Sequence, residues 1–349
     1  MRIVIGLSLL LLLLIDSVAS AQLSTGWKAH DLDRPQPKVV TASLEPGGPP
    51  SDAVVLFDGT DLSQWLSSSG GDPKWRIVDG AMESVPRSGY VVSKQKFGDC
   101  QVHVEFASPE TVKGSGQGRG NSGVFLMGEF EVQVLDSYEN ETYSDGSAGS
   151  IYGQYPPLVN ASRLPGQWQS YDIVFKRPRF DDQGKLQSSA QLTVFHNGVL
   201  IQNANEALGP TNWIRHKSYE KMKGKVDGPL SLQDHGNPVR YRNIWVRNLP
   251  AVQRPAKVAT DSVPHKLTQD QADNLIGQYG GHRVIQSGDD LSFVFNGNTP
   301  LTLVAKTSAE FEFKETAGAL EFEMDEDGNA IGIEIHLDAA GVRKAKRGK

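Results

Sequence analysis

Cysteine is almost absent from this chain. Cys100 is its one occurrence in 349 residues, so no intrachain disulfide can form and the core must be stable without covalent cross-links. Cys100 begins the strand-like run DCQVHVEF, where a free cysteine is typically a small buried hydrophobic residue. The eight histidines are scattered, without His-x-x-x-His spacing or a cysteine partner, which argues against a zinc site.

The chain also lacks a net positive charge. The net charge is −6, which argues against nucleic acid as a partner because phosphate binding needs a basic surface. The glycine-rich run KGSGQGRGNSG lacks the lysine of a phosphate-binding loop and the glycine spacing of a dinucleotide site, and no Gly-x-Ser-x-Gly motif occurs. These absences argue against a nucleotide-binding protein and against a serine hydrolase with that motif.

A long hydrophobic run occurs once, at the N-terminus. Arg2 precedes the apolar stretch 3–15, and Ala19-Ser20-Ala21 fits a cleavage site, so residues 1–21 are predicted to be a signal peptide. An uncleaved anchor is the alternative, although the stretch is short for a membrane span. We therefore expect a secreted, periplasmic or cell-surface protein with no stable membrane span after cleavage.

Shifts in composition divide the mature chain into two predicted domains. Residues 22–52 are rich in Pro and Gly and are expected to form a flexible leader. Residues 53–249 form a larger β-domain, residues 250–264 a linker, and residues 265–349 a small accessory β-domain.

Helical periodicity is weak, and short alternating runs dominate residues 53–249. In EFEVQVLD, apolar residues alternate with Glu and Gln, and Asp79-Gly80 and Asn197-Gly198 are typical of tight hairpin turns. Many short strands without intervening helices predict an all-β sandwich or jelly roll.

The C-terminal domain begins with the one segment of helical character, LTQDQADNLIGQYGG at 267–281. Thr268 and Gln271 have the spacing of a capping box, and Gly280-Gly281 is the expected end of the helix. Short strands follow, so we predict a small, mostly antiparallel β-domain with one short helix.

Polar residues on the predicted strands are candidates for a site. Glu131 and Gln133 are two apart on a strand and point to the same face, where a carboxylate beside an amide suits sugar recognition. A solvated strand carboxylate is the alternative for Glu131. Asn121 and Asp136 are expected near the same end of a hairpin, and Asp136 either contacts substrate or caps a loop.

Two other segments supply further candidates. Gln233 and His235 share a face, with Asp234 opposite, and His235 is either an acid–base group or an exposed turn residue. Tyr152 and Tyr155 lie in the glycine-containing run IYGQYPP and are candidates for stacking on a sugar ring.

Four sequence blocks carry a family resemblance: VVLFDGTDLSQW (54–65), GNSGVFLMGEFEVQVLDSY (120–138), GSIYGQYPPLVNASRLPGQWQSYDIVF (149–175) and GPLSLQDHGNPVRYRNIWVRNL (228–249). In this order they resemble the 3-keto-disaccharide hydrolase family. The resemblance implies a concanavalin A-like jelly-roll sandwich that acts on glycosides oxidised at the sugar 3-position, and it favours Glu131 as a catalytic residue. Residues 265–343 resemble the small tail domain of β-lactamase-like serine hydrolases, and no catalytic residue comes with that resemblance.

The expected activity is therefore that of a glycoside hydrolase or lyase with a carbohydrate substrate. Removal of the C2 proton next to a 3-keto group, followed by elimination at C1, needs a base, an acid and donors to the enolate oxygen. Glu131 and His235 are the catalytic candidates. No cofactor is required by the sequence, but a divalent cation such as calcium is compatible with it, with Asp136 and Glu105 as candidate ligands.

Two other functions remain open. One is a non-catalytic carbohydrate-binding protein of the cell surface that uses the same polar face, and the other is a structural or adhesion protein with the two linkers as spacers.

Overall fold

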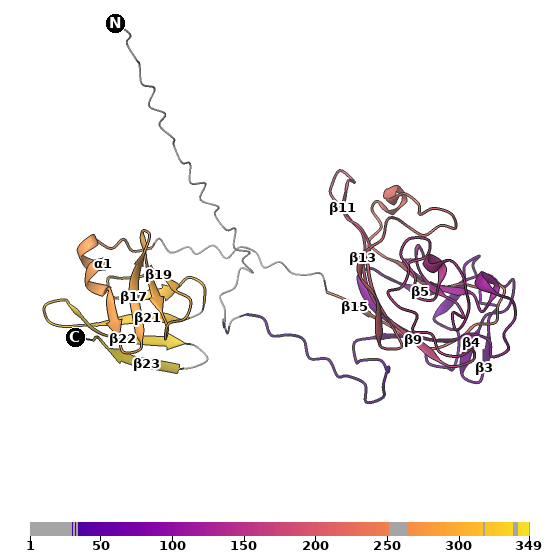
Figure 1. Cartoon of the computed structure of the whole chain (residues 1–349), viewed down its shortest axis with the longest axis horizontal. Coiled ribbons are helices and arrows are strands. Elements are labelled where there is room, and N and C mark those ends of the chain that lie inside the picture. The colour runs from indigo at the N-terminus through magenta and orange to yellow at the C-terminus, as the bar shows by residue number, and fades with distance from the viewer. Residues whose placement is uncertain are drawn as a thin grey trace, which may run out of the picture. The chain divides into compact units, whose positions relative to one another are not determined.

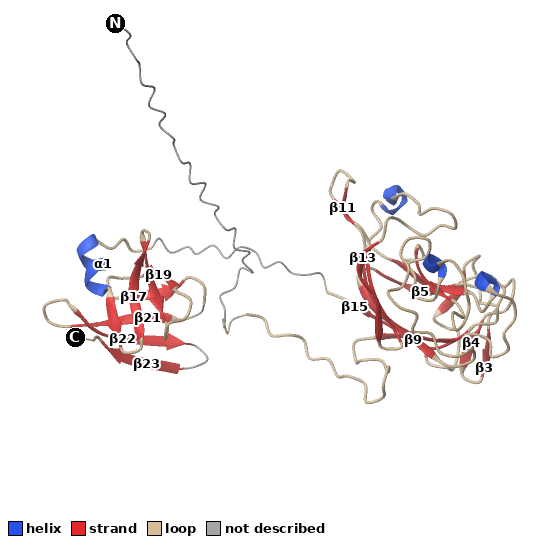
Figure 2. Ribbon diagram, in the orientation of Figure 1, coloured by secondary structure: helices blue, strands red, loops and turns tan. Residues whose placement is uncertain are grey.

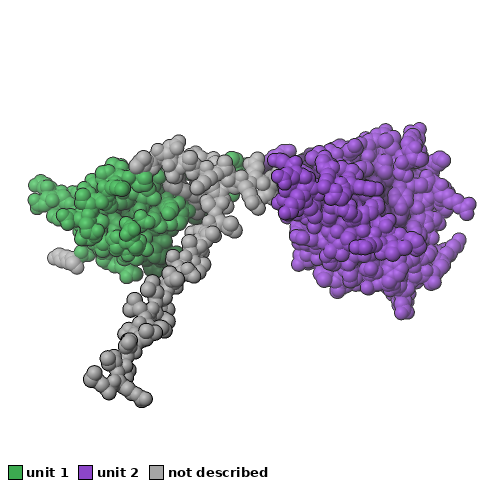
Figure 3. Space-filling view, turned by 90° about the horizontal axis from the view of Figure 1, so that it is seen from above, with its two compact units in different colours: residues 1–37, 253–349 green, residues 38–252 purple. Residues whose placement is uncertain are grey.

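The computed structural model describes residues 30, 32, 34–250, 264–316, 318–337 and 341–348. They fall into two compact units, one beginning at Lys38 and ending in the segment after β15, the other made mainly of the C-terminal residues (Figures 1 and 3). The predicted signal peptide and nearly all of the predicted linker 250–264 lie outside the described residues. Within the described part of the chain, no helix has the length and apolar character needed to cross a membrane.

The larger unit contains two antiparallel sheets (Figure 2). One has eight strands, in the order β13 (Val199–Glu206), β12 (Gln191–His196), β9 (Gln169–Lys176), β6 (Cys100–Ala107), β15 (Arg240–Asn248), β4 (Ala81–Glu83) and β3 (Arg76–Val78), with β1 (Val54–Phe57) also paired to β15. The other has five, in the order β2 (Trp65–Ser67), β5 (Val91–Phe97), β14 (Gly228–Leu232), β7 (Ser122–Leu126) and β8 (Phe130–Val134). A two-stranded ribbon and three short 3-10 helices complete the unit: β10 (Arg179–Phe180), β11 (Leu186–Ser188), η1 (Gly116–Gly118), η2 (Ser144–Gly146) and η3 (Tyr219–Met222).

The two sheets pack face to face around one hydrophobic core, as the alternating sequence predicted. Phe130, Val132 and Val134 on β8 are fully buried, because successive residues of a strand point to opposite faces and these three point inward. The Phe130 ring lies 5.6 Å from the Phe175 ring on the opposite sheet. Cys100 belongs to the same core, and burial raises the pKa of its thiol to about 12. The expected all-β sandwich is confirmed.

Both hairpin turns predicted from sequence are formed. Asn197 and Gly198 join β12 to β13 with positive φ angles of 53° and 80°. Asp79 and Gly80 join β3 to β4 in the same way, with φ of 51° and 72°. These are the backbone conformations of the two-residue turn that matches the twist of paired strands.

The second half of the predicted leader is folded onto the larger unit. The Gly47 carbonyl oxygen accepts hydrogen bonds from Trp245 Nε1 and Asn243 Nδ2, both at 2.9 Å. Asp52 is ion-paired with Arg247 at 2.8 Å. The expectation of a flexible leader over 22–52 therefore does not hold for residues 38–52, because these polar contacts fix them to β15.

The smaller unit is one antiparallel meander with a short helix, as predicted. Its strands follow chain order: β16 (Gly277–Tyr279), β17 (His282–Ser287), β18 (Asp290–Val294), β19 (Leu301–Ala305), β20 (Glu310–Phe313), β21 (Ala319–Met324), β22 (Ala330–Leu337) and β23 (Gly341–Lys346). The first and last strands meet through the Gly280 N–H and the Lys346 carbonyl oxygen at 3.1 Å, so the sheet closes on itself.

The helix of this unit, α1 (Gln269–Leu275), has the predicted start but not the predicted end. Thr268 Oγ1 accepts from the Gln271 N–H at 3.3 Å, and Gln271 Oε1 accepts from the Thr268 N–H at 2.9 Å, which completes the capping box. The helix stops five residues before Gly280. Tyr279 is fully buried on β16, so pairing with β17 takes precedence over further helix in this segment.

Truncating the core ring of β8 is expected to destabilise the larger unit strongly. Phe130→Ala removes a fully buried ring and leaves a cavity between the sheets, which costs about 3–5 kcal/mol in the free energy of unfolding. Phe195→Ala, at a partly exposed ring on β12, is the matched control and should cost much less. Urea unfolding of both variants measures the difference, and equal losses would contradict the packing described here.

Candidate functional site

A cavity of about 430 Å³ lies on the outward face of the five-stranded sheet. Its lining combines one carboxylate with amides, hydroxyls and aromatic rings, which is the mixture expected of a small-molecule site. The described residues that line it are Tyr90, Asn121, Phe125, Gly128, Glu131, Gln133, Tyr152, Thr211, Asn212, Trp213, Lys217, Gln233 and His235.

The floor of the cavity is formed by the β7–β8 hairpin. In this pairing Gly123 lies opposite Gln133, and Phe125 lies opposite Glu131. Residues directly opposite each other share a face of the sheet, so Glu131 and Gln133 point together into the cavity while their neighbours enter the core. The prediction that these two side chains share a face is confirmed.

Glu131 is buried although it carries an ionisable group. Only 4% of its surface is exposed, and no ion pair of its carboxylate is found among the described residues. Removal from water penalises the charged form, so burial raises the pKa of Glu131 from its ordinary 4.5 to about 8. A carboxylate with this property near neutral pH can hold or accept a proton as a general base.

Gly123 makes room for this carboxylate. A Cβ atom at Gly123 would overlap Glu131 Oε1, so a residue with a side chain could not take this place without displacing Glu131. The backbone of Glu131 is also fixed, because its N–H donates to Thr211 Oγ1 at 2.9 Å.

The amide side chains of Gln117, Asn121 and Gln133 lie in a row beside Glu131, with Gln133 Nε2 3.2 Å from Gln117 Oε1. Asn121 Nδ2 donates to the Gln117 carbonyl oxygen at 2.7 Å, and Gln133 Nε2 can donate to Asn121 Oδ1 at 3.3 Å. With its amide turned over, Gln133 donates instead to Glu131 Oε1 at 3.1 Å. The row therefore offers donors and acceptors to sugar hydroxyls, and the Gln133 amide can respond to the charge on Glu131.

The predicted pair from the segment after β14 is found at the cavity. Gln233 Nε2 donates to the Tyr90 hydroxyl at 2.6 Å, and His235 is exposed at the rim. Asp234 turns away, with its carboxylate accepting from the Gly89 and Gly236 N–H groups at 3.2 and 2.8 Å. Tyr152 also lines the cavity, and its stacking on a sugar ring stays a prediction.

Several lining residues were not predicted from the sequence. Thr211, Trp213 and Lys217 lie in the loop between β13 and β14, and Tyr90 immediately precedes β5. This loop has no periodicity and no motif, so the sequence carries no signal of its position. Tyr90 becomes recognisable only from its bond to Gln233, which joins residues far apart in the chain.

Asp136 and Tyr155, which were expected to contact substrate, do not line the cavity, and neither does Glu105, which was expected only as a metal ligand. Asp136 is buried and ion-paired with Arg119 at 2.6 Å. Its carboxylate is thus occupied by an internal cation, and its Oδ1 also accepts from the Tyr138 N–H in the local turn that was the alternative for this residue. Tyr155 packs against the core instead.

The two predicted calcium ligands are not brought together. Glu105 lies on β6 of the eight-stranded sheet, ion-paired with Arg242 at 2.6 Å, whereas Asp136 follows β8 of the other sheet. Each carboxylate has its own arginine. A cluster with metal-ligand spacing among the described residues is found in the smaller unit instead, at Glu321, Glu334 and His336, but Glu334 is already ion-paired with Lys344.

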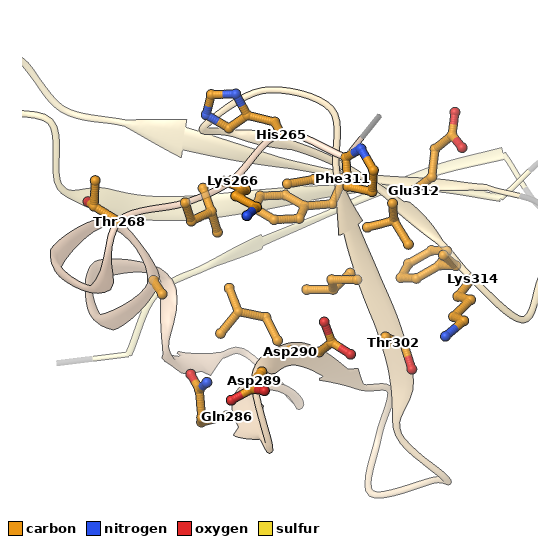
Figure 4. Close-up of a pocket in the computed structure, with 18 of the residues that line it drawn as sticks. His265, Lys266, Thr268, Gln286, Asp289, Asp290, Thr302, Phe311, Glu312 and Lys314 are labelled. Carbon is orange, nitrogen blue, oxygen red and sulfur yellow. The ribbon is translucent and has the colours of Figure 1, made fainter. Parts of the chain in front are cut away.

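The smaller unit has a cavity of its own, of about 830 Å³ (Figure 4). Leu291, Leu303 and Phe311 contribute an apolar lining, and Figure 4 shows Lys314 and Asp290 beside it. None of the candidate residues predicted from sequence lines this cavity. The cavity that contains Glu131 combines a carboxylate of raised pKa with several amide side chains. We therefore take that cavity as the candidate site.

Comparison with known proteins places this site in a family of sugar-active domains. Residues 52–247 match the family described as 3-keto-alpha-glucoside-1,2-lyase-like domain, and this range includes every described residue that lines the Glu131 cavity. The resemblance of the smaller unit to the tail domain of β-lactamase-like hydrolases stays a prediction.

One solved structure resembles this chain in both sequence and fold. A candidate glycosyl hydrolase from Parabacteroides distasonis is 45% identical, with a TM-score of 0.59 over 63% of this chain and 94% of that chain. A second candidate glycosyl hydrolase from this organism is 18% identical, with a TM-score of 0.42 over 61% of this chain and 100% of that chain. Among curated proteins, none matches the chain.

Burial of Glu131 should make stability depend on pH. Its folded-state pKa lies above the unfolded value, so the native state holds an extra proton between about pH 4.5 and about pH 8. The free energy of unfolding should therefore fall as pH rises through this window, by at most about 1.4 kcal/mol per pH unit. Urea titrations at about pH 5 and about pH 8 measure this fall.

Two variants test whether Glu131 causes the fall in stability with pH. Glu131→Gln should remove the fall with pH, because its amide does not titrate. Glu220→Gln, at an exposed carboxylate on η3, should keep it. Parallel pH profiles for wild type and Glu131→Gln would show that Glu131 ionises normally.

Proposed function

Because the chain belongs to the family of 3-keto-alpha-glucoside-1,2-lyase-like domains, we propose that it cleaves glycosides oxidised at C3 of the sugar. The observation that supports this most directly is the buried Glu131, with its raised pKa, at the floor of a cavity lined by amides and aromatic rings. Such a carboxylate is suited to removing a proton from carbon next to a ketone.

The reaction proceeds by elimination. Glu131 takes the proton on C2, and the electron pair of the C2–H bond forms an enolate with the C3 oxygen. When the C3 carbonyl re-forms, the pair moves into a C1–C2 double bond, and the C1–oxygen bond to the leaving group breaks. Addition of water across this double bond then gives the free 3-keto sugar.

The neighbours of Glu131 supply the remaining groups. Gln233 Nε2 uses one N–H for the Tyr90 hydroxyl, so its second N–H can donate to the enolate oxygen or to a ring hydroxyl. Asn121 and Gln133 can do so by exchanging their present hydrogen bonds for bonds to the substrate. The departing oxygen needs a proton, for which Lys217 and His235 are the candidates on the cavity wall. Both side chains line the same cavity, and His235 is the one that the sequence predicted as an acid–base group.

The composition of the cavity argues against ordinary glycoside hydrolysis. That chemistry uses two carboxyl groups on either side of the scissile bond. Among the described residues that line the cavity, Glu131 is the one carboxylate. A single base surrounded by amides matches elimination next to a ketone, which needs no second carboxylate.

Export of the protein is part of the proposal. The pattern of residues 1–21 supports a signal peptide, and the site would then act on sugars outside the cytoplasm. N-terminal sequencing of the exported protein tests this directly, because cleavage after Ala21 would leave Gln22 as the first residue.

Replacing the base should abolish turnover. Glu131→Gln keeps the shape of the side chain but cannot accept the C2 proton, so kcat/KM on a 3-keto glucoside should fall at least about a hundredfold. In the wild type, kcat/KM should rise about tenfold per pH unit up to the pKa of about 8 and then level off, because the ionised carboxylate is the active form.

The control for this experiment is Glu220→Gln, which removes a carboxylate outside the cavity and should retain wild-type turnover. Binding of the substrate to Glu131→Gln is measured in parallel by calorimetry. Sugar binding by the wild type without turnover of any 3-keto glycoside would favour the non-catalytic carbohydrate-binding alternative.

A further inference from the structure

An exposed tryptophan stands at the wall of the cavity. Trp213 has 79% of its surface exposed, and it lines the cavity that contains Glu131. A tryptophan side chain gains free energy by burying a large apolar area, so leaving it in water forgoes that gain. Aromatic side chains that line a cavity together with a few polar groups are typical of a small-molecule site.

The segment that carries Trp213 is anchored on both sides. Before it, the Thr211 N–H donates to the Glu129 carbonyl oxygen at 2.7 Å. After it, the Lys217 N–H donates to the Pro210 carbonyl oxygen at 2.7 Å, and Lys217 Nζ is ion-paired with Glu129 at 3.4 Å.

These anchors connect Trp213 to the base. Glu129 immediately precedes β8, and Thr211 Oγ1 accepts from the Glu131 N–H at 2.9 Å. The loop that carries Trp213 is therefore attached to the strand that positions the carboxylate.

A second aromatic side chain lines the cavity from a neighbouring loop. Tyr152 lines the cavity, and its hydroxyl is hydrogen-bonded to that of Tyr143 at 2.8 Å. The backbone after Tyr152 approaches the Trp213 loop, since a Cβ at Gly153 would lie 3.9 Å from the Asn212 carbonyl oxygen. The aromatic side chains thus follow the edge of the cavity, while the amides lie deeper beside Glu131.

We infer that Trp213 forms a second subsite, which holds a ring of the substrate other than the one whose C2 faces Glu131. An aromatic face stacks on flat or apolar ring faces, and a pyranose and an aromatic aglycone both present such a face. The inference rests on the proposed function and adds the residue that would hold the second ring, whether that ring is a sugar or an aromatic group.

Kinetics with substrates of different size test this subsite. Three 3-keto glucosides are compared: a methyl glucoside, a disaccharide and a nitrophenyl glucoside. Trp213→Ala should lower kcat/KM roughly tenfold to a hundredfold for the two-ring substrates and leave the methyl glucoside within about twofold. Trp213→Phe should restore most of the loss, and the disaccharide and nitrophenyl arms show which kind of second ring is preferred.

Ile214→Ala is the matched control. Ile214 is the next residue in the loop and 80% exposed, but it does not line the cavity, so this variant should behave as wild type on all three substrates. Equal losses on one-ring and two-ring substrates, or no loss on either, would overturn the second subsite.

Calorimetry separates failure of this inference from failure of the proposed function. If the wild type turns over none of the 3-keto glucosides, the proposed function is wrong, but binding of unoxidised disaccharide and monosaccharide still tests the subsite. Tighter binding of the disaccharide that is lost in Trp213→Ala supports it. Equal binding of both sugars, or a preference that Trp213→Ala leaves unchanged, contradicts it.

Discussion

The alternation of side chains along β8 is the constraint on which the rest of the larger unit depends. Phe130, Val132 and Val134 fill the core between the sheets, and Glu131 and Gln133, interleaved with them, form the floor of the cavity. Because the side-chain period of a strand is two, a shift of one residue would place the carboxylate in the core and a phenylalanine in the cavity. The same packing that stabilises the sandwich therefore fixes the orientation of the base.

This arrangement has an energetic cost that the core must offset. Glu131 is held out of water without an ion pair among the described residues, which disfavours its ionised form. Gly123 leaves space for the carboxylate, and the neighbouring amides can solvate it in part. A carboxylate that contributed only to stability would be expected on the surface or beside a cation, as Asp136 is beside Arg119. The cost at Glu131 is thus better explained by chemistry than by folding.

The sequence predicted the parts of this structure that depend on neighbouring residues. Period-two alternation indicated the sheets and the shared face of Glu131 and Gln133, and Asn197-Gly198 indicated a hairpin. Contacts between segments far apart in the chain could not be predicted from the sequence. Arg119 neutralises Asp136 from across a hairpin, and the loop of Trp213 reaches the cavity by bonds to β8. Neither position follows from local pattern, and the same holds for residues 38–52, whose Pro and Gly content resembles a flexible linker although Gly47 and Asp52 bind β15.

The separation of polar and aromatic groups within the cavity has a consequence for catalysis. Contacts between Trp213 and a second ring would be made far from C2. They would therefore stabilise the bound substrate and the transition state equally, unless binding of this ring also changes the environment of the reacting groups. The environment of Glu131 would change in this way. A second ring that covers the cavity displaces water, and a less hydrated carboxylate is a stronger base toward the C2 proton. Above about pH 8, where Glu131 is ionised, a substrate with a ring over Trp213 would then be deprotonated faster as well as bound more tightly. The Trp213 loop and the buried carboxylate are held to the same strand through Glu129 and Thr211. Binding of the second ring and removal of the C2 proton can therefore be coupled.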